Sequence, residues 1–60
     1  MFSLYRSHDR ELLYHGTIDE ARAAGIRYHA ATNEVTFKGQ RHKILNRHID
    51  RDYVAFWIAS

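Results

Sequence analysis

The chain has no cysteine, and this absence most constrains how its sixty residues can fold. Neither a disulfide nor a thiolate-bound zinc ion is available to hold the fold together. A chain of this length buries only roughly 60% of the surface that it exposes when unfolded, so its stability must come from a small apolar core. The hydrophobic share of 45% is typical of a folded chain. We therefore expect one small domain over residues 1–60, and pairing as a homo-oligomer or with a partner is one route to added stability.

The clearest local signal is a capped helix. Thr17 is a favourable N-cap, and Glu20 stands three residues later, where a capping-box partner belongs. The apolar residues from Ile18 onward follow a helical stripe, and Gly25 suits the position just past the C-terminus. The pattern predicts a short helix over residues 18–24.

Around this helix the sequence alternates as strands do. Segments 2–6 and 12–15 predict an N-terminal hairpin, and segments 26–30, 34–38 and 41–45 predict a meander with turns at Thr32-Asn33 and Gly39-Gln40. Residues 53–58 favour a strand, although Asp50 could instead cap a helix there. We predict an α+β fold, a small antiparallel sheet with one short helix in the order ββαββ(β).

Positive charge is concentrated in one segment. Residues 38–51 contain five Lys or Arg side chains and one acidic side chain, whereas residues 1–37 contain four Lys or Arg side chains and five acidic ones. Such a segment suits a polyanion, because each neutralised phosphate releases counterions. We therefore predict a small basic non-catalytic module that engages nucleic acid or a nucleoprotein machine through a Lys/Arg-rich hairpin, and its expected partner is nucleic acid or an acidic protein surface. The predicted contact residues are Lys38, Arg41, His42, Lys43, Arg47 and Arg51. The alternative is a basic sheet edge that only prevents aggregation.

Five histidines raise the question of chemistry. Their spacing does not match a metal site, so no metal ligands are predicted. A further hypothesis is a small His-dependent ribonuclease in which His29, Glu34, Arg41 and His42 meet across the meander. Because no Walker loop, dinucleotide-binding turn or nucleophile elbow occurs, we assign no cofactor and no catalytic residue, and expect a chain that is not an enzyme.

Residues 13–24 resemble the strand-turn-helix of small sheet-plus-helix DNA-binding modules, and are similar to the equivalent element of small phage proteins that inhibit host polymerases. The Thr-x-x-Glu-Ala centre of this run is a capped helix, and we assign no family. The short length and exposed sheet edges make a phage- or mobile-element-type inhibitor or adaptor of a host protein our alternative hypothesis. The longest apolar run, residues 53–59, is too short to cross a membrane, so we expect a cytoplasmic protein without a membrane partner.

Overall fold

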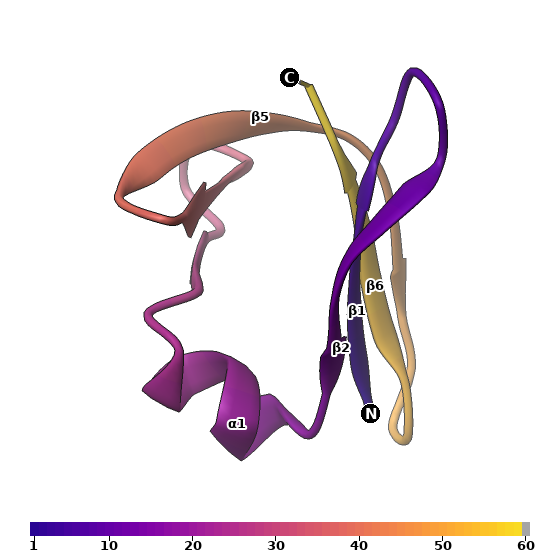
Figure 1. Ribbon diagram of the computed structural model, residues 1–60, viewed down its shortest axis with the longest axis vertical. Helices are drawn as coiled ribbons and strands as arrows, with labels where there is room; N and C mark the ends of the chain where they lie inside the picture. The colour runs from indigo at the N-terminus through magenta and orange to yellow at the C-terminus, as the bar shows by residue number, and fades with distance from the viewer. Residues whose placement is uncertain (60) are drawn as a thin grey trace.

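Strands dominate residues 1–59, which the computed structural model describes (Figure 1). In chain order the elements are β1 (Phe2–Arg6), β2 (Glu11–Gly16), α1 (Ile18–Ala23), β3 (Arg27–His29), β4 (Glu34–Phe37), β5 (Gln40–Ile49) and β6 (Val54–Ile58). The predicted N-terminal hairpin, helix and meander are all present. The C-terminal segment is a strand, which resolves the ambiguity between strand and helix in favour of the strand.

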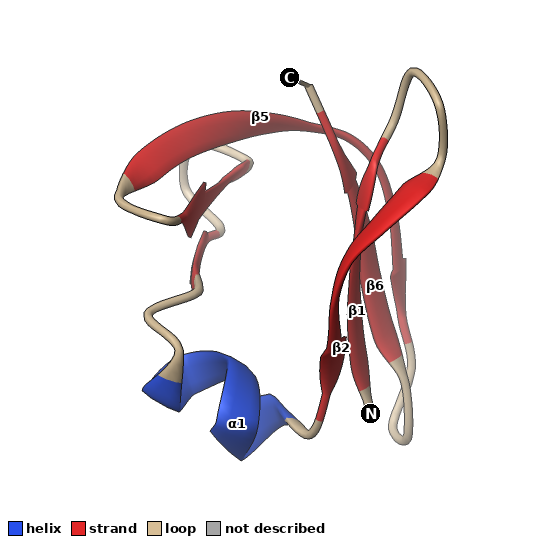
Figure 2. Ribbon diagram, viewed as in Figure 1, coloured by secondary structure: helices blue, strands red, loops and turns tan. Residues whose placement is uncertain are grey.

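The strands form one curled sheet in the order β2-β1-β6-β5-β4-β3. Figure 2 shows β5 arching from the β3–β4 end of the sheet across to β6, while α1 lies at the open side of the curl, across from β1 and β2. We call the side of the sheet that faces α1 the concave side and the opposite side the outer side. The curl therefore gives the molecule an enclosed core and a convex exterior.

Two parts of the predicted fold class were wrong. The sheet is mixed, because β1 and β6 run parallel while the other neighbouring pairs are antiparallel. Four strands follow the helix, whereas the order ββαββ(β) has at most three there, and each of the four segments predicted after the helix overlaps one of them. The predicted strand 41–45 is also longer, since a bulge between Ile44 and Asn46 lets β5 bend and pair with β6.

Alternation along the strands places the core on the concave side. The buried cluster consists of Phe2, Leu4, Ala21, Ile26, Val35, Ile44, Phe56 and Ile58. The sequence suggests Trp57 as a further core residue, but its ring is half-buried on the outer side and stacks on Tyr5, with 5.2 Å between ring centroids. Neighbouring residues of β6 point to opposite sides of the sheet, so Phe56 and Trp57 cannot both enter the core.

The helix is short but well terminated. The Thr17 side chain accepts a hydrogen bond from the Glu20 backbone, and the Glu20 carboxylate accepts one from the Thr17 backbone at 2.8 Å. Gly25 adopts φ +86°, the left-handed conformation expected just after a helix. The capping box predicted from the sequence is confirmed, and it fixes where the chain turns from β2 towards the meander.

Candidate nucleic-acid interface

Six polar side chains share the outer side of the meander formed by β3, β4 and the first half of β5. The register aligns Arg27 with Thr36 and Thr36 with Arg41, and it aligns His29 with Glu34 and Glu34 with Lys43. The alternate residues point inward. Val35 is fully buried, and the Tyr28 ring packs on the Phe56 ring with 4.8 Å between their centroids. We call the surface formed by Arg27, His29, Glu34, Thr36, Arg41 and Lys43 the meander face.

The meander face is positively charged. Arg27, Arg41 and Lys43 supply three cations, and Glu34 is the one carboxylate among its six residues. Arg41 Nη1 lies 3.2 Å from Glu34 Oε1, an exposed ion pair that contributes little to stability. The pKa of Glu34 is lowered, chiefly by a hydrogen bond from Thr32 and then by Arg41, so its carboxylate stays ionised. The Glu34 carboxylate balances one of the three cations, so the meander face keeps a positive net charge.

Hydrogen bonds hold two of the side chains of this face in place. His29 Nε2 lies 2.8 Å from Thr36 Oγ1 on the adjacent strand. Arg27 Nη1 donates to the carbonyl oxygens of Arg22 at 2.8 Å and Ile26 at 3.2 Å, at the end of α1. Since the last carbonyls of a helix lack partners within it, this arginine also helps to terminate α1.

The structure brings together only part of the predicted basic hairpin. Arg41 and Lys43 lie two residues apart on the meander face. Lys38 occupies the adjoining turn with φ 52°, followed by Gly39 with φ 78°, and its ammonium group lies 5.4 Å from the centroid of the Phe37 ring. Two successive residues with positive φ are typical of a tight type I′ hairpin turn. The turn therefore precedes Gln40, which already belongs to β5.

The other three predicted contact residues lie elsewhere. His42 pairs with Val35 and faces the concave side, where its Nδ1 lies 3.0 Å from the carbonyl oxygen of Ala59. Arg47 also faces the concave side, and its Nη1 donates to the Tyr28 hydroxyl at 2.8 Å. Arg51 lies in the exposed turn between β5 and β6. None of the three shares the meander face with Arg41 and Lys43.

The bulge in β5 explains why Arg47 is separated from Arg41. In an unbroken strand, residues 41, 43, 45 and 47 would all point to the same side. The extra residue at Leu45 reverses this alternation, so Arg47 pairs with the core residue Phe56 and points inward. In place of Arg47, the register adds Arg27, which the sequence analysis did not include. Arg27 stands two residues before His29, so alternation along a strand predicts that both side chains point to the same side of the sheet.

The residues of the ribonuclease hypothesis are likewise brought together only in part. His29 and Glu34 are direct cross-strand partners, and Arg41 contacts Glu34, so these three share the meander face. His42 is excluded because it points to the opposite side. Within residues 1–59, no group of three His, Cys, Asp or Glu residues has a geometry that could hold a metal ion.

A second polar and aromatic cluster lies on the outer side of β1 and β6. Tyr5 stacks on Trp57, and Ser3 Oγ lies 2.9 Å from His15 Nδ1. The pKa of Tyr53 is lowered by hydrogen bonds with Ser3 and then Tyr5, whereas the Tyr5 pKa is raised, mainly by Tyr53. These contacts fill the outer layer above the centre of the sheet, and Ser3 is 1% exposed as a result.

Comparison with known proteins finds no matching family model, no matching curated protein and no matching solved structure. In the described part of the chain, no helix is long and apolar enough to cross a membrane.

Proposed function

We propose that the protein is a small binding module that engages the phosphate backbone of nucleic acid through the meander face. The observation that supports this proposal is the register that aligns Arg27, Thr36 and Arg41 across three strands and places Lys43 beside them. Neighbouring strands lie about 4.8 Å apart, so these cations are spread over a surface wider than one phosphate. An extended polyanion can contact several of them at once.

The chemistry of the side chains suits phosphate oxygens. Arg41 presents a planar guanidinium group, which can donate two parallel hydrogen bonds to phosphate oxygens, and Lys43 adds a mobile point charge. Arg27 keeps its Nε and Nη2 groups for a phosphate, since only its Nη1 donates to the carbonyl oxygens of Arg22 and Ile26. Phosphate contacts give affinity without reading sequence. The proposed module therefore binds with little sequence preference, and its affinity depends on salt.

The test is the salt dependence of binding to a labelled oligonucleotide. Three neutralised phosphates give a slope of log K against log salt of about −2 for a single strand and about −3 for a duplex. The variant Arg41→Gln/Lys43→Gln is expected to make this slope shallower by about 1.4 to 1.8. Fluorescence anisotropy between about 50 and 200 mM salt measures both slopes.

A matched control separates the meander face from net charge. The variant Arg10→Gln/Arg51→Gln loses the same two charges from the β1–β2 turn and from the β5–β6 turn, outside this face. It should retain the original slope. An equal loss in both double variants, or no binding by the unaltered protein, would refute the proposal. Circular dichroism of each variant verifies that it is folded.

A second candidate function is RNA cleavage, and the direct pairing of His29 with Glu34 favours it. Cross-strand partners place their Cβ atoms about 5 Å apart, so both side chains can reach one phosphodiester. Ionised Glu34 would take the proton of the 2′ hydroxyl as it attacks phosphorus. Protonated His29 would give a proton to the departing 5′ oxygen, and Arg41 would stabilise the charge on the phosphoryl oxygens.

This candidate predicts cleavage of bulk RNA to 2′,3′-cyclic phosphate ends. His29→Ala should lower the rate about 100-fold or more, because it removes the general acid. His8→Ala is the matched control, since His8 is exposed in the β1–β2 turn, and its cleavage rate should not change. If the unaltered protein leaves RNA intact, or if both variants cleave equally, the ribonuclease hypothesis is wrong and the binding proposal is unaffected.

A further inference from the structure

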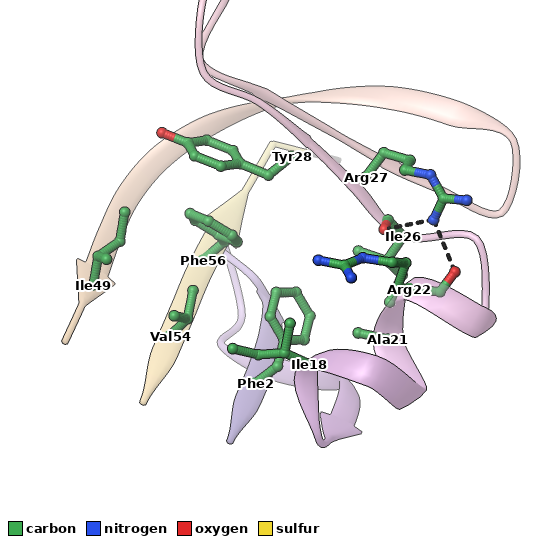
Figure 3. Close-up of a pocket in the computed structure, with 10 residues that line it drawn as sticks. All are labelled: Phe2, Ile18, Ala21, Arg22, Ile26, Arg27, Tyr28, Ile49, Val54 and Phe56. Atoms are coloured by element: carbon green, nitrogen blue, oxygen red, sulfur yellow. Dashed lines mark hydrogen bonds between the residues drawn. The ribbon is translucent and has the colours of Figure 1, made fainter. Parts of the chain in front are cut away.

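The concave side of the sheet is not fully covered. A groove of about 440 Å³ lies between α1 and the ends of β5 and β6 (Figure 3). Its floor is apolar and includes Phe2, Ala21 and Phe56. The groove exists because α1 has only six residues, of which Ala21 alone is buried, and because it packs mainly against β2. The helix is therefore too short to cover the side chains of β5 and β6.

Large apolar side chains are exposed on both sides of this groove. Ile18 of α1 is 44% exposed, and Ile49 of β5 is 56% exposed. Tyr28, which is 38% exposed, closes a third side. A ligand small enough to sit on the floor would leave these isoleucines in water, whereas a partner that spans the groove would cover them. These side chains and the apolar floor offer a surface that a partner protein could cover.

The charges beside the groove are positive. Figure 3 shows the Arg22 guanidinium reaching over the groove from α1, and Arg27 turning instead towards the end of the helix. Arg47, two residues before Ile49, does not line the groove itself but is held at the hydroxyl of Tyr28, on the third side. Neither Asp nor Glu is among the residues that line the groove. A partner with acidic residues beside its apolar ones would complement both walls.

The backbone around the groove favours a helical partner. β1 and β6, which supply Phe2, Val54 and Phe56, each have neighbouring strands on both sides, so the floor of the groove offers the occupant no free backbone groups. The second half of β5, at the rim of the groove, pairs with β6 alone. An extended segment laid across these side chains would leave its own backbone groups without partners, whereas a helix satisfies them internally. The apolar side of a helix can then enter the groove, and its flanking residues can reach the walls.

We propose that this groove binds a short amphipathic helix of another protein, with its apolar side between Ile18 and Ile49 and with acidic residues facing Arg22 and Arg47. This inference does not rest on the nucleic-acid proposal, because the groove opens on the concave side of the sheet. Arg27 is the one residue that both lines the groove and belongs to the meander face, and none of the test variants replaces it. Together the two surfaces describe an adaptor that joins a nucleic acid to an acidic protein segment.

The test is selection of helical peptides from a displayed random library against the unaltered protein. Selected peptides should have apolar residues at helical spacing, flanked by Asp or Glu. The strongest peptide, once synthesised, should bind the Ile49→Lys and Arg22→Glu variants at least about tenfold more weakly. Replacing by Lys only the acidic residue that faces Arg22 should restore affinity for Arg22→Glu, a rescue that lost packing alone would not give.

Leu45→Lys is the matched control for the groove. Leu45 is 61% exposed on the same strand but lies at the bulge, outside the groove, so its replacement should leave peptide affinity unchanged. Nucleic-acid binding by Ile49→Lys should also be unchanged, which keeps the two proposals separable. The inference fails if no such peptide is selected, if Ile49→Lys binds it normally, or if the groove mediates self-association in sedimentation experiments. It also fails if the groove binds dodecanoate but no peptide.

Discussion

At the scale of single residues, the best-defined polar contact is the pair of Arg6 and Asp9. The Arg6 guanidinium donates two hydrogen bonds to the Asp9 carboxylate, at 3.1 and 2.8 Å. The backbone N–H of Glu11 donates a third to Asp9, at 3.1 Å. These bonds span the β1–β2 turn, in which Arg10 has φ 58°, so Asp9 stabilises an uncommon backbone conformation.

This contact predicts a pH dependence of stability. The pKa of Asp9 is lowered from 3.8 to about 2, chiefly by the hydrogen bond from Arg6. A carboxyl group whose pKa is lower in the folded state stabilises the fold above its unfolded pKa, and this stabilisation is lost as the pH falls from about 4 to about 2. Asp9→Asn should therefore reduce stability at neutral pH and flatten the acid limb of the stability curve.

Urea unfolding at a series of pH values measures this effect. The matched control is Asp52→Asn, since Asp52 forms no ion pair within residues 1–59. The control should follow the unaltered protein across the acid range. If the free energy of unfolding depends on pH in the same way for Asp9→Asn and the unaltered protein, the contact between Arg6 and Asp9 does not persist in solution. The expected effect is modest because both side chains are partly exposed.

At the scale of elements, the helix depends on its first turn. α1 has six residues, too few to be stable in isolation, so the capping box and the packing of Ala21 maintain it. Gly16 matters as well, because a Cβ atom there would lie 2.9 Å from Glu20 Oε1, the oxygen that accepts from the Thr17 backbone. The small residue before the N-cap thus gives room for the cap.

Thr17→Ala removes the side chain that caps α1. It should lower the free energy of unfolding by about 1 kcal/mol, because a backbone N–H at the helix start loses its partner. Thr17→Ser keeps the hydroxyl and is the matched control, with stability close to that of the unaltered protein. Chemical unfolding compares the three proteins. Equal losses for the Ala and Ser variants would contradict a capping role and would indicate that the methyl group matters instead.

Local elements were predictable from the sequence, and the exceptions have physical causes. The capped helix, the β1–β2 hairpin and the C-terminal strand depend on neighbouring residues, so their signals are visible in short windows. The bulge at Leu45 has no such signal, because it is set by the need of β5 to pair first with β4 and then with β6. This one extra residue turns Arg47 to the concave side, so Arg47 does not belong to the meander face.

At the scale of the whole molecule, the sequence could not specify which strands are neighbours. The pairing of β1 with β6 joins residues about fifty positions apart, and no local pattern reports it. Which residues form the meander face also depends on how the strands pair. The predicted residues Arg41 and Lys43 share it because they lie on one strand, whereas Arg27 joins them through the registers of β3 with β4 and of β4 with β5.

The parallel pairing of β1 with β6 has a consequence for synthesis in the cell. β1 is translated first, yet its neighbour on one side is the last strand of the sheet to leave the ribosome. Until Ile58 emerges, the buried side chains of β1 lack half of their surroundings, and the nascent chain has an exposed strand edge beside a preformed hairpin. Closure of the sheet on this side of β1 therefore waits for β6, and the interval before it is when chaperones or premature association can act on this chain.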